Sequence, residues 1–211
     1  MLSLIGLGLY DEKDLSVRAK EEIEDCDLLF MEKYTSKWEG QEELEEMIEK
    51  KIDVLERSQL EENFDEILKK AEEKRIGILI PGDPLVATTH IELLIQARRK
   101  EIKTKVVHSS SIYSAVAETG LQIYKFGKTT TIPYPEDNYR PESPYYVIKE
   151  NREMGLHTLV LLDVKPDKAM EVCEAISYLL QLEKEKGEDV IDPNETVVAF
   201  SVKGKKTHLV Y

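Results

Sequence analysis

Ile76-Gly-Ile-Leu-Ile-Pro-Gly-Asp-Pro-Leu-Val-Ala-Thr-Thr-His90 decides the fold of this chain. Its first five residues are an apolar run, which predicts a strand buried on both faces of a parallel sheet. The loop that follows is stiff, because Pro81 and Pro84 fix their own φ angles, while Gly82 accepts a positive φ. Ligands of open α/β sheets bind beyond the carboxyl ends of the strands. The stretch therefore predicts an α/β fold with Asp83 near a bound small molecule; an ordinary strand-to-helix turn is the alternative.

On both sides of this stretch, short apolar runs alternate with amphipathic helical segments, a pattern typical of βα units. In the first half we expect strands at residues 2–5, 27–31, 52–55, 76–80 and 105–108, and helices at 15–26, 42–51, 58–74 and 91–99. Asp11 or Asp14 is the expected cap of the first helix, and Ser58 opens the third with Glu61 in a capping box. Helices between the strands predict mainly parallel pairing.

The pattern restarts after residue 108, which predicts a second α/β lobe. In this half we expect helices at residues 109–120, 145–154 and 168–186, and strands at 129–132, 157–163, 197–200 and 209–211. The predicted domains are an N-terminal lobe of residues 1–108 with a mostly parallel sheet and a C-terminal lobe of residues 109–211.

The composition excludes several classes of protein. A net charge of −13 argues against direct nucleic-acid binding, which needs a basic surface. No apolar run approaches the roughly 18 residues of a membrane span, and the N-terminus lacks the pattern of a signal peptide. Cys26 and Cys173 lie within apolar helical patterns, so we expect buried free thiols in a reducing compartment. A cytoplasmic protein is the expectation.

Several kinds of site find no support in the sequence. Gly6-Leu-Gly8 lacks the third glycine of a dinucleotide fingerprint, and there is no phosphate-binding loop of the G-x-x-x-x-G-K-[ST] type. His90, His108, His157 and His208 have no partners at metal-ligand spacing, so no metal site is predicted. Neither cysteine has a neighbouring base, and no nucleophile elbow is present. Chemistry that needs neither a metal nor a side-chain nucleophile remains open.

A set of local patterns occurs in a fixed order along the chain and is more specific than any one of them. The patterns are Gly6-Leu-Gly-Leu-Tyr-Asp11, Tyr34-Thr-Ser36, residues 81–90, Ser111-Ile-Tyr-Ser-Ala-Val116, Gly120-Leu-Gln-Ile-Tyr-Lys-Phe-Gly-Lys128, Ile148-Lys-Glu-Asn151 and Gly155-Leu-His-Thr-Leu159, leading to Leu161-Leu-Asp163. From residue 2 to about residue 165 the chain resembles the diphthine synthases, the archaeal branch of the tetrapyrrole-methylase-like enzymes that use S-adenosylmethionine.

This resemblance implies a fold and a reaction. The fold would be two α/β lobes of the tetrapyrrole-methylase type, usually in a homodimer, with the cofactor in the cleft between the lobes. The reaction would be N-methylation of the modified histidine of translation elongation factor 2, a step of diphthamide biosynthesis. Methyl transfer from a sulfonium needs alignment and exclusion of water but no covalent catalyst, which fits the absence of nucleophile motifs.

The family pattern also implies which residues would bind the cofactor, although it identifies no catalytic residue. These are Leu9, Asp83, Val86, Ser111, Ile112 and Leu162. Core packing is the alternative for Leu9, Val86, Ile112 and Leu162, each taken alone. Asp83 is harder to explain by packing, because a charged residue beside a buried strand end needs a partner.

The C-terminal part departs from the family, whose members usually continue for several tens of residues. Val197-Val-Ala-Phe-Ser-Val202 resembles a second-lobe strand, and Gly204-Lys-Lys-Thr-His-Leu-Val210 resembles a later segment in which a histidine lies near the cofactor. We expect a hairpin that packs on the second-lobe sheet beside the strand of residues 157–163, with His208 lining the cofactor site. Alternatively, His208 plays no part in the cofactor site.

Two other functions are compatible with the sequence. The first is a related methylase that acts on a tetrapyrrole or another small molecule. The second is a homologue that binds the cofactor with weakened or lost turnover, because the C-terminal segment is short. The patterns at residues 81–90 and 111–116 favour elongation factor 2 as the substrate.

Overall fold

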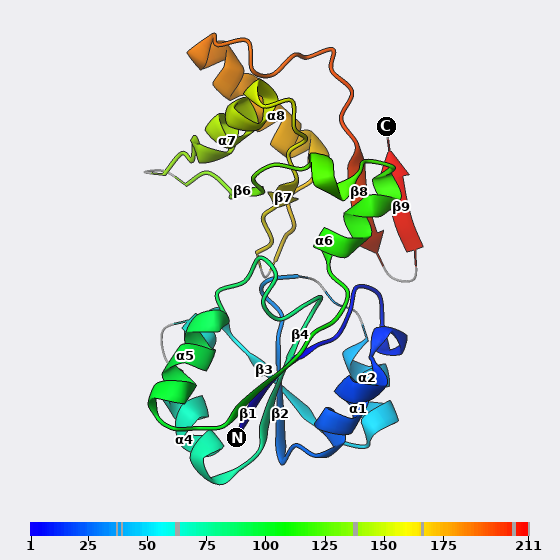
Figure 1. Cartoon of the computed structure of the whole chain (residues 1–211), viewed down its shortest axis with the longest axis vertical. Coiled ribbons are helices and arrows are strands. Elements are labelled where there is room, and N and C mark those ends of the chain that lie inside the picture. Colours follow the sequence, from blue (N-terminus) through cyan, green and yellow to red (C-terminus); the bar gives the residue numbers. More distant parts are fainter. Residues whose placement is uncertain are drawn as a thin grey trace. The chain divides into compact units, whose positions relative to one another are not determined.

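The computed structural model describes residues 1–36, 38, 40–61, 64–136, 139–165, 167–203 and 206–210 (Figure 1). Of residues 61, 203 and 206–209 it describes the backbone alone. The chain divides into two compact units. The first comprises Met1–Ala115 with Val202–Thr207, and the second comprises Val116–Ser201 with His208–Tyr211.

The first unit is built on a five-stranded sheet with the order β3-β2-β4-β1-β5. The strands are β1 (Leu2–Gly6), β2 (Leu28–Glu32), β3 (Ile52–Leu55), β4 (Ile76–Ile80) and β5 (Thr104–Val107). Every pair of neighbours in this sheet is parallel, which confirms the pairing expected from the βα alternation. The apolar run at the start of the quoted stretch is β4, and it lies in the middle of the sheet.

Helices cover both faces of this sheet (Figure 1). One face carries α1 (Val17–Glu24) and α2 (Gln41–Ile48), with the short 3₁₀ helix η1 (Glu12–Asp14) before them. The other face carries α3 (Arg57–Glu61), α4 (Asp65–Glu73) and α5 (Ile91–Arg99). The unit is therefore a three-layer α/β/α sandwich.

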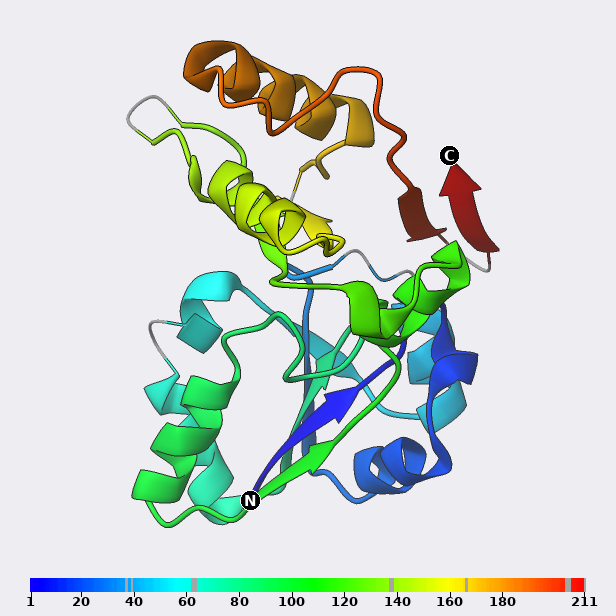
Figure 2. The ribbon, with the colours of Figure 1, turned by 45° about the horizontal axis from the view of Figure 1, so that its top comes forward.

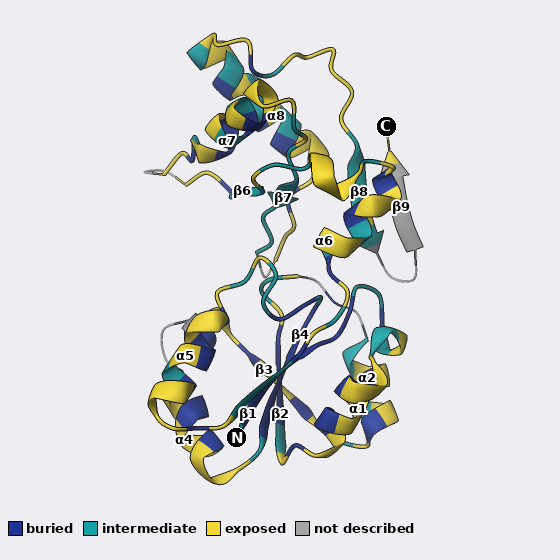
Figure 3. Cartoon of the chain, viewed as in Figure 1, coloured by how far each residue is buried: buried dark blue, intermediate teal, exposed yellow. Residues whose placement is uncertain are grey.

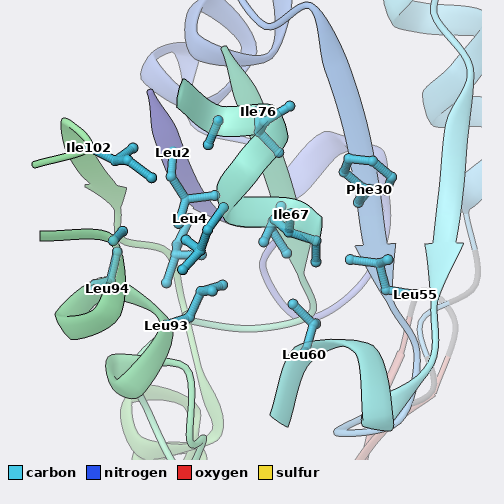
Figure 4. Close-up of a cluster of buried hydrophobic side chains, with 14 of the residues drawn as sticks. Leu2, Leu4, Phe30, Leu55, Leu60, Ile67, Ile76, Leu93, Leu94 and Ile102 are labelled. Carbon is cyan, nitrogen blue, oxygen red and sulfur yellow. The ribbon is translucent and has the colours of Figure 1, made fainter. Parts of the chain in front are cut away.

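Alternation along the strands produces two separate cores. In β4, Ile76, Ile78 and Ile80 pack towards α4 and α5, whereas Leu79 packs towards α1 and α2. Figure 4 shows the first of these cores, with Leu2, Leu4, Phe30 and other side chains filling the space between sheet and helices. Strands β1, β2 and β4 are buried along nearly their whole length, while the helices are buried on one side only (Figure 3). A strand covered on both faces must be apolar throughout, which is why β4 reads as an unbroken apolar run.

Two expected helix starts are wrong. The cap of α1 is Ser16, whose side chain accepts a hydrogen bond from the N–H of Ala19. Asp11 instead caps η1, and Asp14 accepts hydrogen bonds from two main-chain N–H groups before it. The helix expected at residues 58–74 is two helices, and Ser58 lies inside α3 instead of capping it.

The second unit contains a small parallel sheet of β6 (Thr130–Ile132) and β7 (Val160–Leu162), with α7 (Ser143–Glu153) and α8 (Val172–Lys186). Its 3₁₀ helices are η2 (Val116–Thr119) and η3 (Ile123–Lys125). The helix expected at residues 109–120 is shorter, because α6 (Ile112–Ala115) is followed by η2. Of the strand expected at residues 157–163, only the part that forms β7 is a strand. Ile132, Tyr145, Tyr178 and Leu182 are among the buried side chains of this core.

A single carboxylate organises much of the second unit. Glu183 accepts hydrogen bonds from the main-chain N–H groups of Asp189, Val190 and Ile191 at 2.7–2.9 Å. The Tyr145 hydroxyl also donates to it, at 2.9 Å. The hydrogen bond from Ile191 is the strongest influence that lowers the pKa of Glu183, while burial, helped by Glu183, raises the pKa of Tyr145 to about 12. The segment after α8 is thus fixed by α8 itself.

The last two strands, β8 (Ala199–Lys203) and β9 (Lys206–Val210), pair with each other in a separate two-stranded sheet. The expected pairing of these two segments is confirmed. Neither strand pairs with β6 or β7, and the expected packing of the hairpin on the second-lobe sheet beside residues 157–163 stays a prediction. The expected turn at Gly204 and Lys205 lies outside the described residues.

Both cysteines are free, but their environments differ from the expectation. Cys26 is buried, and this burial raises the pKa of its thiol to about 11. Cys173 is exposed, since the buried face of α8 carries Ala175, Tyr178 and Leu182, and Cys173 points away from it. Among the described helices, none has the length and apolar character that crossing a membrane requires.

Glu22 is a buried carboxylate that joins α1 to two strands. The Ser3 hydroxyl donates to Glu22 Oε1 at 2.6 Å, and the Lys105 ammonium donates to Oε2. Ser3 and Lys105 are register partners on β1 and β5, so both reach the same helix face. Burial alone would raise the pKa of Glu22, but the hydrogen bonds from Lys105 and Ser3, together with the charges of Lys105 and Arg75, lower it. This carboxylate therefore stabilises the folded state in its ionised form.

We predict that Glu22→Gln lowers the free energy of unfolding at pH 7 by about 1–3 kcal/mol, the usual effect of weakening a buried charged hydrogen bond. The folded-state pKa lies below the ordinary value of 4.5, so the contribution is complete above that pH. It should disappear as the pH falls through the lowered pKa. Urea unfolding between pH 7 and pH 3 measures this, with exposed Glu21→Gln as the control. A constant difference across the whole pH range would contradict the assignment.

Candidate functional site

The carboxyl ends of the parallel strands meet at one edge of the five-stranded sheet. β1 lies between β4 and β5, with Gly6 opposite Ile80 and Ile5 opposite Val107. Figure 2 shows β1 in blue and β5 in green running side by side from the N-terminal end of the sheet. Consequently, the loops that follow β1, β4 and β5 leave the sheet at neighbouring points. This is the edge at which ligands of open α/β sheets bind.

Glycines allow these loops to come into direct main-chain contact. Gly82 N–H donates to the Gly8 carbonyl at 2.8 Å, and Gly8 N–H donates back to the Gly82 carbonyl at 3.3 Å. Both residues have positive φ angles, 82° for Gly8 and 72° for Gly82. A Cβ atom at Gly6 would lie 2.7 Å from both the Gly82 carbonyl oxygen and Ser109 Cβ. Any side chain at Gly6 would therefore separate the three loops.

Asp14 holds the loop after β1. Its Oδ2 atom accepts hydrogen bonds from the N–H groups of Leu9 and Tyr10, both at 2.9 Å. The main-chain N–H of Leu9 is thus directed at Asp14, while the residue as a whole is half-buried. Leu9 therefore presents a partly accessible side chain on a fixed backbone.

Asp83 finds its partners inside the protein. The residue is only 6% exposed. Its Oδ1 atom accepts from the N–H of Leu85 at 3.0 Å, and its Oδ2 atom accepts from the N–H of Ser109 at 3.1 Å and from His108 Nδ1 at 2.8 Å. The carboxylate thus joins the loop after β4 to the segment after β5. This explains the charged residue beside a buried strand end without reference to a ligand.

The rest of the loop after β4 is held by its own polar groups. The Thr88 hydroxyl donates to the Pro84 carbonyl at 2.6 Å. His90 is buried, and its Nδ1 atom donates to the same carbonyl at 3.1 Å, so Nε2 is left to accept from the Tyr34 hydroxyl at 3.3 Å. Ala87 has a φ of 55°, a conformation that costs a residue with a side chain about 1 kcal/mol. The loop is stiff, and Val86 is half-buried within it.

The segment after β5 leads into α6. The carbonyl of Ser111 accepts from the N–H groups of Ser114 and Ala115, both at 3.0 Å, so this residue begins the helix. The N–H of Ser111 donates to the Ser114 hydroxyl at 3.1 Å. Ser111 is buried, whereas Ile112 is half-buried.

Glu32, at the end of β2, was not anticipated from the sequence. It is fully buried, and its Oε2 atom accepts from the N–H groups of Tyr34 and Thr35, both at 3.1 Å. The Thr35 hydroxyl donates to Oε1. Glu32 thereby fixes the turn that carries Tyr34 to His90. A carboxylate directly after an apolar strand was the signal that would have identified it.

The structure thus brings some of the predicted site residues together. All five of the following lie at this edge of the first unit, the first four in its loops and the last at the start of α6: Leu9, Asp83, Val86, Ser111 and Ile112. Leu162 ends β7 in the second unit, where it is half-buried and pairs with Ile132. His208 lies in β9, and its side chain falls outside the described residues.

His108 is the residue at this edge that the sequence reasoning missed. It was considered only as a metal ligand, although it directly follows β5, and Asp83 lies shortly after the end of β4. Its position after a parallel strand was a sufficient signal. In the described part of the chain, no three His, Cys, Asp or Glu side chains gather as a metal ligand set.

Comparisons with known proteins agree with this architecture. Residues 1–202 match the family model of tetrapyrrole (corrin/porphyrin) methylases. The chain is 45% identical to the diphthine synthase of Methanocaldococcus jannaschii, over 100% of this chain and 85% of that protein. It is 44% identical to the diphthine synthase of Methanococcus vannielii, over 97% of this chain and 82% of that protein.

Solved structures show the same similarity. A crystal structure of diphthine synthase superposes with a TM-score of 0.82 at 41% identity, covering 87% of this chain and 72% of that one. A putative diphthine synthase from Entamoeba histolytica gives a TM-score of 0.87 at 37% identity, covering 100% of this chain and 83% of that one. The resemblance noted in the sequence is therefore confirmed, and the chain belongs to the tetrapyrrole methylase family, within its diphthine synthase branch.

Proposed function

We propose that this protein transfers a methyl group from S-adenosylmethionine to the amino group of the modified histidine of translation elongation factor 2, in diphthamide biosynthesis. The observation that carries the proposal is the edge formed by the loops after β1, β4 and β5, in a chain whose similar proteins are named diphthine synthases. Both the ligand-binding position in the fold and the names of its relatives favour this activity.

The residues at this edge fit such a cofactor. A Cβ atom placed on Gly82 would meet no heavy atom closer than the Ser110 carbonyl oxygen, at 3.9 Å. Space is therefore open beside the backbone of the loop, which lets a ligand approach it closely. The half-buried side chains of Leu9, Val86 and Ile112 offer apolar contacts at the same edge. Ligand sites usually combine such apolar walls with a few fixed polar groups.

We propose as cofactor-binding residues the set that the family resemblance implies. They are Leu9, Asp83, Val86, Ser111, Ile112, Leu162 and His208. Asp83 contributes mainly by fixing the loop, because three of the roughly four acceptor positions of a carboxylate are already used by protein donors. Leu162 and His208 enter by resemblance to the family, and Leu162 lies at the end of a parallel strand as the other sites do.

When bound, S-adenosylmethionine supplies a methyl group on a sulfonium centre. The sulfur leaves as a thioether, which needs no covalent catalyst. The protein's contribution is then to hold the reacting groups in line and to exclude water. The stiffness of the loop after β4, with its two prolines and its buried His90, suits this task. No nucleophilic side chain is required.

We also propose a homodimer in the cytoplasm, where elongation factor 2 acts. The second unit exposes several large apolar side chains. They include Ile123 (47% exposed), Tyr124 (90%), Met154 (73%) and Val172 (40%). Exposed apolar surface of this kind is typical of interaction sites. A methylase of tetrapyrroles or other small molecules is less favoured, because the most similar named proteins are diphthine synthases along nearly the whole chain.

The first prediction concerns Gly82. Gly82→Ala should weaken S-adenosylmethionine binding by about tenfold or more, or about 1.4 kcal/mol, because the new methyl group occupies the space that the ligand approaches. Calorimetric titration measures the dissociation constant. The matched control is Gly155→Ala, since Gly155 has a similar φ of 66° and also has open space around its Cβ position. Both variants should lose similar stability, about 1 kcal/mol. Equal cofactor affinity in the two variants would move the site away from this loop.

The second prediction concerns the substrate. Methyl-labelled S-adenosylmethionine should label elongation factor 2 that carries the aminocarboxypropyl-histidine precursor, and should not label elongation factor 2 with an unmodified histidine. Mass spectrometry locates the label. Cofactor binding without labelling would support a binding protein that has lost turnover. Labelling of a tetrapyrrole instead would support the small-molecule methylase.

The third prediction concerns assembly. Light scattering at micromolar protein concentration should give twice the mass of one 24.3 kDa chain. Val172→Glu places a charge on an exposed apolar position of α8 and should shift the mass towards the monomer, because an unpaired charge in an interface is costly. The control is Cys173→Ser, a polar substitution at the neighbouring exposed residue. A monomeric wild-type protein would refute the homodimer.

A further inference from the structure

His108 and Asp83 form an acid–base pair at the carboxyl edge of the sheet. His108 Nδ1 lies 2.8 Å from Asp83 Oδ2. The Asp83 side chain is 7% exposed, whereas the His108 side chain is 68% exposed. The pair therefore extends from a buried carboxylate to an imidazole that is open to the outside of the first unit.

The hydrogen bond fixes which nitrogen of His108 carries the proton. An ionised carboxylate only accepts, so Nδ1 must donate, and in neutral imidazole Nε2 is then the acceptor. Asp83 cannot turn away easily, because Leu85 N–H and Ser109 N–H hold both of its oxygens. Among the described residues, His108 Nε2 has no hydrogen-bond partner. The pair presents a fixed, available lone pair at the proposed site.

The proposed reaction has a use for such a lone pair. A primary amine is protonated at neutral pH and must lose a proton before its nitrogen can attack. Imidazole is the side chain most often used for this task. Resting on the methyl transfer proposed above, we infer that His108 is the catalytic base that accepts this proton, and that Asp83 is a positioning residue that orients His108.

The proton transfer balances without a further reactant. The N–H bond of the substrate ammonium breaks, and its electron pair stays on nitrogen for the new N–C bond. The proton forms a bond to His108 Nε2 and converts the imidazole into imidazolium beside the Asp83 carboxylate. Because His108 is exposed, the imidazolium then returns the proton to water, and the pair is ready for another transfer.

Three other acid–base groups at this edge are occupied in holding loops. Both ring nitrogens of His90 have partners, the Pro84 carbonyl and the Tyr34 hydroxyl. Glu32 binds the turn after β2 with both oxygens, and Asp14 binds the N–H groups of Leu9 and Tyr10. His108 differs from them in its exposure.

The first test needs neither cofactor nor activity. Two-bond ¹H–¹⁵N correlation spectra of the full chain report which nitrogen of each neutral histidine carries the proton. His108 should show the Nδ1–H form, and Asp83→Asn should reduce its population relative to the Nε2–H form. A wild-type His108 in the Nε2–H form would overturn the inference.

The second test separates proton acceptance from structure. His108→Ala should lower kcat by about 100-fold, within the usual range for loss of a general base. The KM values of both substrates should change by less than about threefold, since binding contacts remain. Added imidazole should restore part of kcat, because the missing side chain was exposed and leaves an accessible space. His157→Ala removes another exposed histidine, whose ring packs against Phe126, and should retain kcat without any response to imidazole.

Measured at saturating cofactor, Asp83→Asn should lower kcat by about tenfold or more, and Asp83→Glu should recover part of the loss. An unchanged kcat in His108→Ala would overturn the inference, as would a loss that imidazole does not restore. If the wild-type protein binds no S-adenosylmethionine or labels no elongation factor 2, the proposed function fails instead, and the histidine spectra still decide whether the pair has the inferred geometry.

Discussion

The structure of the first unit depends on the close main-chain contact between Gly8 and Gly82. Each glycine donates one hydrogen bond to the other, and each does so from a positive φ angle that a side chain would strain. Gly6 adds a second requirement, because its missing side chain lets Ser109 and the loop after β4 approach β1. Main-chain hydrogen bonds therefore join the loops after β1 and β4, and the missing side chain of Gly6 makes room for the segment after β5 beside them.

Buried and half-buried carboxylates then fix the individual loops. Asp14, Asp83 and Glu32 each accept two or three hydrogen bonds from nearby groups, most of them main-chain N–H groups. A buried carboxylate is costly unless its lone pairs are used, so each of these residues is satisfied by the turn that it organises. Asp83 is distinguished by a side-chain partner, His108, which carries the effect of the buried charge to an exposed ring. The hydrogen bonds that fix the loop therefore also orient the proposed base.

The second unit is stabilised in a different way. Its parallel sheet has two short strands, and much of its order comes from the hydrogen bonds of Glu183 with the segment after α8. β8 and β9 pair with each other, and neither adds a strand to the sheet of β6 and β7. The large exposed apolar side chains of this unit are suited to contacts with other molecules.

By itself, the sequence determined the α/β class, the parallel first sheet and the position of the loop after β4. These follow from local signals, because an apolar run such as Ile76–Ile80 requires cover on both faces and a parallel sheet supplies it. It also indicated the family through ordered motifs. Helix starts were less accurate, since Asp14, Ser16 and Ser58 are all suitable caps and only the folded loop shows which N–H groups each one meets. Tertiary structure alone decided that Asp83 is paired with His108, residues that are 25 positions apart. Strands β4 and β5 lie on either side of β1, so the segments that follow them come together, and no local sequence pattern indicates this.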